Sequence, residues 1–253
     1  MTRWWAFPPS TTKLQLDEKW SFVTKKEKHC DDTVAADDRC GDQWDHVALD
    51  PDSRLVLDAK VGPRTTETAT ELLVSVRQRL GKRTPALVNT DEHAPYFAAL
   101  LLVFGQILLP PRTGQPGRPA DPYVAPPAEM CYGTVHKTRA RGRVTAVDTR
   151  VQWGELPAGT RISTSYLERQ HGTDRHRNAR KGRKTYRFSK DWTVHEAMTY
   201  FTLFTANFCW PVRTLRVRDS KGCWQARTPA MVAGLTDHVW SLREWLTYPA
   251  VQR

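Results

Sequence analysis

The chain has 253 residues, of which 40% are hydrophobic and 10% aromatic, and this is enough to bury one substantial core. Its longest apolar run, residues 97–111, contains Gly105 and Gln106 and is shorter than the roughly 20 residues that a membrane-spanning helix needs. The N-terminus lacks the long apolar stretch and cleavage site of a secretory signal, so we expect a cytoplasmic protein without a membrane partner.

The net charge of +11 is concentrated in one short segment. Residues 169–190 contain nine Lys and Arg and a single acid, Asp174, so they carry +8 of the total. A segment of this kind favours a nucleic acid or another polyanion as the partner. A solvated basic helix and an RNA contact of the ribosomal type are the alternatives.

The five cysteines favour reduced, structural thiols, because their number is odd and their spacing is wide. His29, Cys30, Cys40 and His46 have side chains that zinc prefers. Their irregular spacing argues against a zinc site.

The first half of the chain predicts strands that alternate with helices. Strands follow from alternating apolar and polar residues or from short apolar runs, and helices from apolar residues at helical spacing. The predicted elements are a strand at 13–24, a hairpin of strands at 43–49 and 54–61 with its turn at 50–53, a helix at 65–80, a short buried strand at 86–89, and a buried helix at 95–105. The short strand leads directly into Thr90 and Asp91.

The second half begins with a segment that is rich in proline. Seven prolines in 110–127 argue against regular structure there and predict a long loop. A two-stranded ribbon is predicted at 136–153, with Val144, Ala146, Val151 and Trp153 as its packing positions. Helices are predicted at 163–180 and 192–209. The second of these helices carries an apolar stripe that we expect in the core, formed by Val194, Ala197, Met198, Phe201, Phe204 and Phe208.

Three acids occupy positions where catalytic side chains are expected. Asp17 lies in the first strand, Asp91 ends the short strand, and Glu168 is near the start of a later helix. If the first and fourth strands are neighbours, Asp17 and Asp91 lie side by side, and a helix across that edge supplies the third carboxylate. Mg²⁺ prefers carboxylate oxygens, and two ions about 4 Å apart activate both oxygens of an in-line phosphoryl transfer.

Each acid also has a simpler interpretation. Asp17 is then an ordinary edge-strand acid and Glu18 the functional one, although strand alternation places Glu18 on the opposite face. Asp91 caps the following helix. Glu168 pairs with Arg169 or Arg175 as a solvated helix charge.

The basic segment begins directly after Glu168. On a helix, Glu168, His171, Gly172 and Arg175 share one face, so a metal-binding acid and a phosphate-binding arginine point the same way. The remaining cations are expected to bind the flanking DNA backbone independently of its sequence. The residues predicted to bind DNA are Arg169, Arg175, Arg177, Arg180, Lys181, Arg183, Lys184 and Arg187.

Four motifs of this sequence resemble those of a known enzyme family. They are LDEKWSFVTKK at 16–26, VGPRTTETA at 61–69, NTDEHAPY at 89–96, and TSYLERQHGTDRHRNARKGRKTYRFSK at 164–190. Over about residues 14–210, their order and spacing resemble the DDE transposases of small bacterial insertion sequences, members of the RNase H-like, retroviral-integrase-like superfamily.

The resemblance implies an α/β fold, with an RNase H-like mixed five-stranded sheet flanked by helices. Asp17, Asp91 and Glu168 would be the catalytic, metal-binding triad, and Arg175 the basic residue two helical turns after the glutamate. The implied activity uses two Mg²⁺ ions, or Mn²⁺, to cleave DNA at transposon ends and to join it to target DNA. Double-stranded DNA and further copies of the chain are the implied partners, which would place the protein at the nucleoid.

The expected organisation is an N-terminal arm at 1–13, a catalytic domain at 14–210 that contains the Pro-rich loop 110–127, and a C-terminal extension at 211–253. Family members usually carry an N-terminal zinc-finger and helix-turn-helix region that reads the element ends, whereas about thirteen residues precede the first strand here. We therefore expect either a separately encoded reader or an inactive, DNA-binding relic of a transposase.

The motifs also depart from the family pattern at two positions. His171 stands where Asn is frequent, and Glu92 follows Asp91 where Gly is common. Neither change removes an expected metal ligand. A structure-selective nuclease, such as a junction resolvase, is a third hypothesis, but it requires a fourth acid that is not evident.

Overall fold

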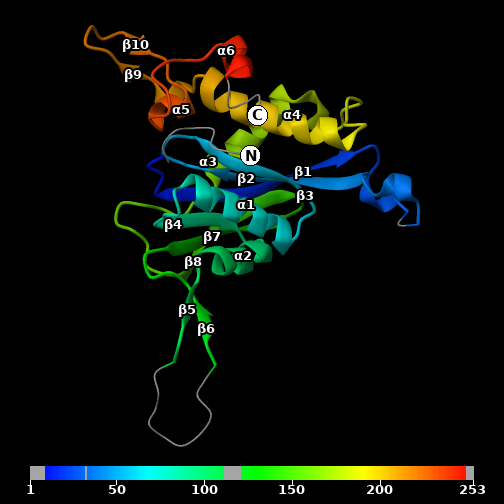
Figure 1. Cartoon of the computed structure of the whole chain (residues 1–253), viewed down its shortest axis with the longest axis horizontal. Helices are drawn as coiled ribbons and strands as arrows, with labels where there is room; N and C mark the ends of the chain where they lie inside the picture. Colours follow the sequence, from blue (N-terminus) through cyan, green and yellow to red (C-terminus); the bar gives the residue numbers. More distant parts are fainter. Residues whose placement is uncertain (1–8, 32, 111–120, 249–253) are drawn as a thin grey trace, which may run out of the picture.

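The computed structural model describes residues 9–31, 33–110 and 121–248, and its centre is a six-stranded mixed sheet in the order β3-β2-β1-β4-β7-β8 (Figure 1). The strands are β1 Lys13–Val23, β2 Gly41–Leu49, β3 Val56–Gly62, β4 Leu87–Asp91, β7 Cys131–Ala140 and β8 Arg143–Trp153. The pairs β1–β4 and β4–β7 are parallel and the others antiparallel. A mixed α/β sheet flanked by helices is confirmed. The predicted five strands are one too few, because both strands of the ribbon join the main sheet.

Four longer helices flank this sheet: α1 Thr66–Arg79, α2 Ala94–Phe104, α3 Ser165–Arg177 and α4 Trp192–Cys209. Short 3-10 helices are η1 Glu27–His29, η2 Ala35–Asp37, η3 Ala179–Lys181 and η4 Arg213–Leu215. The side chain of Thr65 caps α1 by accepting the Thr68 N–H, and Asp191 caps α4 by accepting the Val194 N–H at 2.8 Å. The predicted helices are confirmed within a few residues at each end.

The two faces of the sheet, followed at β1, are covered by different helices. The β1 residues Gln15, Asp17 and Lys19 all contact α3. Since successive side chains of a strand point to opposite faces, Leu14 and Leu16 lie on the other face, where α1 and α2 pack. Both leucines are fully buried. The acidic residues of β1 therefore divide between two different layers.

Helix α4 packs through a face that its apolar stripe did not predict. Val194 is 40% exposed and Ala197 is also exposed, whereas His195 and Thr199 are completely buried. The reason is a set of buried polar groups, which require polar partners from the helix: Thr199 accepts from Lys181, and His195 bonds Ser21 and Ser189. The stripe joins the core toward the C-terminal end of the helix, where Phe204 and Phe208 are buried and Phe201 is partly buried against them. Helix α2 also differs from expectation, since its Leu102 is 68% exposed.

The ribbon of β7 and β8 is more exposed than predicted. Val144, Ala146 and Val151 were expected to pack, yet all three are exposed. Only Trp153 packs as expected, with its ring centroid 4.7 Å from that of Tyr132. The cause is position, because β8 is the outermost strand on its side of the sheet.

A short hairpin projects away from the sheet between α2 and β7 (Figure 1). It consists of β5 Gln106–Leu108 and β6 Tyr123–Ala125, which pair antiparallel. Part of the predicted Pro-rich loop, residues 111–120, lies outside the described residues. Within the remainder, β6 was not predicted: it fits between Pro122 and Pro126, which flank the strand and do not interrupt it.

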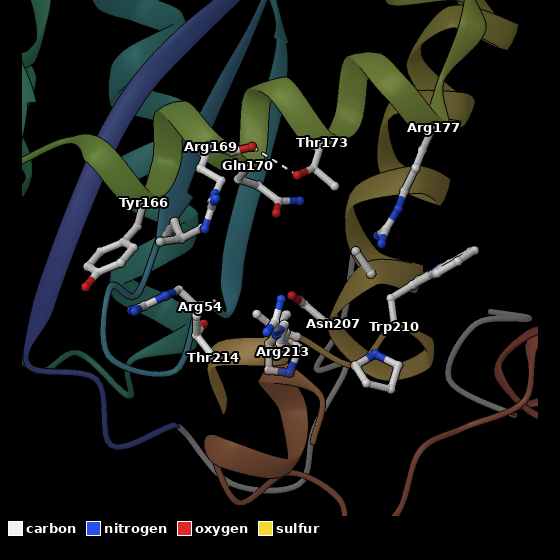
Figure 2. A pocket seen from close by; sticks show the side chains of 15 residues that line it. Arg54, Tyr166, Arg169, Gln170, Thr173, Arg177, Asn207, Trp210, Arg213 and Thr214 are labelled. Atoms are coloured by element: carbon white, nitrogen blue, oxygen red, sulfur yellow. Dashed lines mark hydrogen bonds between the residues drawn. The ribbon is translucent and has the colours of Figure 1, made fainter. Parts of the chain in front are cut away.

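The C-terminal segment packs on α4. Its elements are η4, β9 Val217–Arg218, β10 Trp224–Gln225, α5 Pro229–Val232 and α6 Leu242–Thr247. The rings of Trp240 and Phe208 lie 4.8 Å apart, and Trp245 meets Phe201 edge to face. The segment also meets α3 and α4 around a pocket, shown in Figure 2.

Of the predicted N-terminal arm, residues 1–8 lie outside the described part. No helix among the described residues has the length and hydropathy to cross a bilayer.

Candidate active site

Two neighbouring parallel strands bring Asp17 and Asp91 together. Leu16 of β1 is paired with Thr90 of β4, so the next residue on each strand is an aspartate. The turn that follows β4 holds Asp91 in place, because the carboxylate accepts the His93 N–H at 3.2 Å. The expected adjacency of the two aspartates, which are more than seventy positions apart in sequence, is present in the structure.

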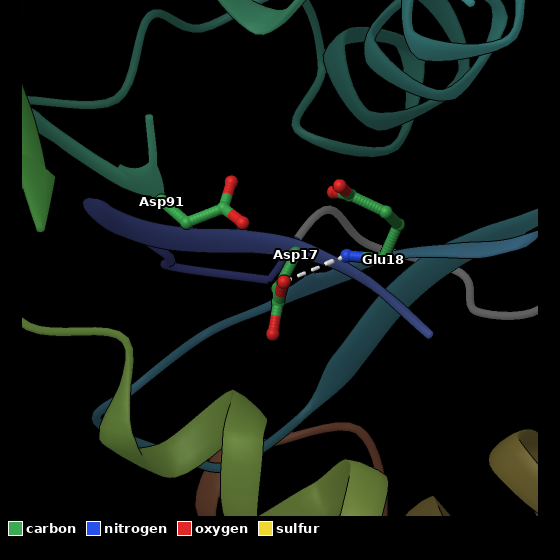
Figure 3. A group of neighbouring side chains, drawn as sticks. All are labelled: Asp17, Glu18 and Asp91. Atoms are coloured by element: carbon green, nitrogen blue, oxygen red, sulfur yellow. Dashed lines mark hydrogen bonds between the residues drawn. The ribbon is translucent and has the colours of Figure 1, made fainter. Parts of the chain in front are cut away.

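Glu18 completes a cluster of three carboxylates with these two aspartates. One oxygen of each of Asp17, Glu18 and Asp91 lies within 4.8 Å of the others. Figure 3 shows Glu18 and Asp91 on one side of β1, with the Asp17 carboxylate directed toward the other side. Among the described residues no other group of three acids, histidines or cysteines comes this close, so His29, Cys30, Cys40 and His46 do not form such a site.

The environment of Glu18 is unusual for a carboxylate. Its side chain is 1% exposed and forms an ion pair with Arg64, whose Nε donates to Oε1 at 2.5 Å. Burial, followed by the nearby charge of Asp91, raises the pKa of Glu18 to about 7. Its second oxygen, Oε2, is buried and has no hydrogen-bond partner. An unsatisfied, inward-facing carboxylate oxygen is suited to a cation.

Glu168 lies in the same cleft but outside the cluster of three. It belongs to the first turn of α3, where it accepts hydrogen bonds from Lys137 of β7 and from Thr164 Oγ1, the latter at 2.6 Å. Its side chain is 42% exposed. The predicted trio of Asp17, Asp91 and Glu168 thus lines one cleft, while Glu18 takes the place of Glu168 in the tight group.

His171 connects helix α3 to the carboxylates. Its Nδ1 lies 3.3 Å from Asp17 Oδ2, and its Nε2 is buried without a hydrogen-bond partner. Burial lowers the pKa of His171, against the opposing effect of Asp17. Of the expected helical face, Glu168, His171 and Arg175 line the cleft, whereas Gly172 lies on another side of α3, beside Arg169 and Thr173.

The cleft as a whole has a volume of about 730 Å³ and a balanced set of charges. Its acids are Asp17, Glu18, Asp91, Glu92 and Glu168. Its cations are Arg64, Lys137, Arg139, Arg175 and Arg183. Acids gathered in the cleft can hold divalent cations, and arginines beside them can bind phosphate oxygens.

Comparisons with protein-family models and with curated proteins found no match.

The carboxylates are a chemically suitable set for Mg²⁺ or Mn²⁺. All three close ligands offer hard oxygen atoms, and the buried Glu18 Oε2 lacks a partner. Burial raises the pKa of Asp91, with the nearby charge of Asp17 adding to the effect, so a cation there would relieve their repulsion.

The residues predicted to bind DNA separate into distinct groups. Arg175 and Arg183 line the cleft, and Arg169 and Arg177 line a pocket on another face of α3. Arg180 is half-buried, and Lys184 and Arg187 are exposed in the segment before α4.

Lys181 is a correction to the predicted DNA-binding set. It is 4% exposed, and its ammonium group donates to both Asp45 oxygens in the interior. A lysine held this way has no free donor for a DNA backbone. Its sequence context gave no sign of this, because its partner is 136 positions away.

Glu18 was considered from the sequence only as an alternative to Asp17. Alternation correctly places the two acids on opposite sides of β1, but the oxygens of Glu18 and Asp91 still meet near the end of the strand pair. The signal that was available is the acid pair itself at residues 17 and 18, close to the predicted strand partner of Asp91.

Proposed function

We propose that the chain is the catalytic core of a DDE-type DNA transposase. The observation that carries this proposal is the cleft in which Asp17 and Asp91, from neighbouring parallel strands, are joined by Glu168 and by arginines. Carboxylates flanked by phosphate-binding cations suit an enzyme that acts on a polyanionic phosphodiester.

An RNase H-like arrangement is part of the proposal. It is supported by the antiparallel order β3-β2-β1, followed by the parallel neighbours β4 and β7. In such a sheet, Asp17 and Asp91 meet where the pairing of β1 with β4 ends, and α3 crosses the same region with the third acid.

The side chains of the cleft divide the work of phosphoryl transfer. Asp17 and Asp91, with Glu168, would hold two Mg²⁺ ions or Mn²⁺. When bound, these ions supply the Lewis acidity that activates the attacking oxygen and stabilises the leaving one. Arg175 and Arg183 would bind non-bridging oxygens of the phosphate and fix its position in the cleft.

One cleft can serve both steps of transposition, because each is an in-line displacement at phosphorus. In the first step water attacks at the transposon end, and the leaving group is a DNA 3′-hydroxyl. In the second step that hydroxyl attacks a phosphate of the target strand, and the leaving group is a 3′-hydroxyl of the target. The cations of the cleft are equally suited to the phosphate of either step, since they contact oxygens common to all DNA.

The test is cleavage of DNA that carries the inverted repeats of the element, incubated with the protein and Mg²⁺. We expect the wild-type protein to nick at the repeat ends. Asp17→Asn, Asp91→Asn and Glu168→Gln should each abolish nicking, because each removes a charged metal ligand. Glu71→Gln, an exposed position of α1, is the matched control and should nick normally. Unchanged nicking in the three cleft variants would refute the proposal.

A second function is favoured by the position of Glu168. Its carboxylate is bonded to Lys137 and Thr164 and lies apart from the three close acids. In a catalytically inactive, DNA-binding relic of a transposase, Glu168 would keep these bonds and would never join the three close acids. This hypothesis predicts salt-sensitive DNA binding with no divalent-dependent cleavage on any substrate. Specific cleavage at repeat ends would exclude it.

A further inference from the structure

A second positively charged site lies on the other side of α3 from the carboxylates. It is a pocket of about 230 Å³ between α3, α4 and the C-terminal segment. Figure 2 shows four arginines around it: Arg169 and Arg177 from α3, Arg54 from the turn between β2 and β3, and Arg213 from η4. Three separate parts of the chain thus supply positive charge to one small space.

The charges of this pocket are not balanced by acids. No Asp or Glu is among the residues that line it. Within the described part of the chain, none of its four arginines forms an ion pair with a carboxylate. Four like charges facing one cavity repel one another, and an anion between them would remove that repulsion.

Two of the arginines are held in place by aromatic rings. The guanidinium of Arg54 lies 3.3 Å from the centre of the Tyr166 ring, and that of Arg177 lies 4.2 Å from the centre of the Trp210 ring. Arg54 also has a φ of 63°, which is uncommon for a residue other than glycine. Such support orients the donors before a ligand arrives, which lowers the entropy cost of binding.

The remaining walls of the pocket are largely apolar. They include Leu49, Ala206, Pro211, Val212 and Pro229. An apolar floor strengthens the interaction of an arginine with an anion, since less water competes for it. It also matches a ligand that carries a hydrocarbon surface beside its charge, as a deoxyribose does beside its phosphate.

Helix α3 forms a common wall of the cleft and the pocket. Glu168, His171 and Arg175 line the carboxylate cleft, whereas Tyr166, Arg169, Thr173 and Arg177 line the arginine pocket. A DNA chain that occupies the cleft and continues around α3 would meet the pocket next.

We propose that the arginine pocket binds one sugar-phosphate unit of a DNA strand, outside the segment that occupies the carboxylate cleft. The ligand chemistry is a phosphate group with an attached sugar, and it involves no base recognition. The choice of DNA as the source of that phosphate rests on the proposed function, whereas the pocket's preference for a phosphate does not.

The test compares two double variants that remove the same charge. Arg169→Gln with Arg213→Gln removes two exposed arginines of the pocket that do not stack on its aromatic rings. Arg161→Gln with Arg243→Gln removes two exposed arginines elsewhere. Binding of a fluorescent DNA duplex is measured by anisotropy in EDTA over a range of salt concentrations. Thermal unfolding of both variants should match the wild type, which establishes that each is folded.

We expect the pocket variant to lose roughly tenfold to 100-fold in DNA affinity, and the control variant much less. The slope of log affinity against log salt should also decrease by about 0.9 for the phosphate that is no longer bound. Equal losses in the two double variants would overturn the proposal.

Competition separates the possible sources of the phosphate. Deoxyribose 5-phosphate should compete with the duplex for the wild-type protein better than inorganic phosphate does, and neither should affect the residual binding of the pocket variant. Protection against thermal unfolding by inorganic phosphate, with DNA affinity independent of the pocket, would show a free-anion site and overturn the proposal. These binding assays contain no divalent ion, so their outcome does not depend on cleavage. Absence of nicking in the separate Mg²⁺ assay would therefore count against the transposase and not against the pocket.

Discussion

Lys181 donates to both carboxylate oxygens of Asp45 at 2.5 Å, inside the protein and out of contact with solvent. Lys19 lies 3.1 Å from the same carboxylate on β2 and is also paired with Asp174 of α3. Two lysines and two aspartates thus form a closed, neutral network between the sheet and the helices that carry the basic segment. Through Lys181, the network joins η3, which follows α3 in the chain, to strand β2 of the sheet.

Replacement of Lys181 by Met should destabilise the protein by about 3–5 kcal/mol, because it leaves part of a buried carboxylate charge uncompensated. Burial and two lysines act on Asp45 in opposite senses, and the lysines hold the pKa of this carboxyl far below its usual range. Urea unfolding followed by circular dichroism measures the effect. Arg187→Met, an exposed cation of the same segment, should change the unfolding free energy by less than about 0.5 kcal/mol. Equal effects of the two substitutions would show that the buried network contributes nothing.

His195 should make the protein less stable in mild acid. Burial, with the adjacent charge of Lys181, lowers the pKa of His195 from 6.5 to about 4 in the folded protein. As pH falls below 6.5, the unfolded chain takes up a proton that the folded chain refuses, so stability decreases until about pH 4. The expected loss over this interval is about 3 kcal/mol, at 1.36 kcal/mol for each pH unit.

This loss is measured by urea unfolding at a series of pH values. His195→Gln should reduce the slope of the curve between pH 6.5 and 4, and the slope that remains belongs to other histidines such as His93, whose pKa is also lowered to about 4. Substitution of the exposed His176 should have much less effect. NMR titration of the wild-type imidazole is an independent check, since protonation of His195 near pH 6.5 would contradict the prediction.

Asn207 should be among the most sensitive polar positions of α4. Its Nδ2 donates to the Val56 carbonyl at 2.8 Å, and its Oδ1 accepts the Val56 N–H at 2.9 Å. The amide therefore continues the hydrogen bonding of β3 along the outer edge of the sheet. Asn207→Leu would leave both backbone groups buried and unpaired, at a cost of about 2–4 kcal/mol. Gln78→Leu, on the exposed face of α1, is the control in the same unfolding experiment, and a similar cost there would contradict this role for Asn207.

Magnesium should raise the melting temperature, and the size of the rise should report on which acids hold the ion. Asp17→Asn and Glu18→Gln should reduce the rise, because their oxygens belong to the close cluster. Glu168→Gln should reduce the rise less, because Glu168 lies outside the close cluster, is bonded to Lys137 and Thr164, and would help to hold only the second ion. The melting temperature of each variant in Mg²⁺ is compared with that of the same variant in EDTA. Differences in stability between the variants therefore do not affect the comparison. If Glu168→Gln removed the rise as fully as Asp17→Asn, Glu168 would have to join the cluster when the ion binds.

Local pattern was sufficient to predict the strands of the main sheet and the four longer helices. Strand alternation in β1 and the apolar spacing of α1 depend on neighbours in the sequence, and these are visible without a structure. The adjacency of Asp17 and Asp91 depended on the condition that the first and fourth strands are neighbours, and the structure shows this pairing.

The sequence was less informative wherever a distant partner decides the outcome. Lys181 resembles its exposed neighbours in the sequence, and only its distant partner Asp45 accounts for its burial. Helix α4 turns His195 and Thr199 inward because distant polar groups, those of Ser21 and Lys181, bond them. Val144 and Val151 have the alternation of a packed strand, yet β8 is an edge strand and they remain exposed. Glu18 joins the cluster through its contact with Arg64, which no local pattern predicts.

The projecting hairpin of β5 and β6 has a consequence for local opening. Three residue pairs hold it together, and Ile107 and Val124 are 74% and 50% exposed, so little apolar burial supports it. A two-stranded hairpin of this kind is marginally stable in water. Its amide protons should therefore exchange with deuterium far faster than those of β1 and β4, and the arm should open and close many times before the central sheet unfolds once.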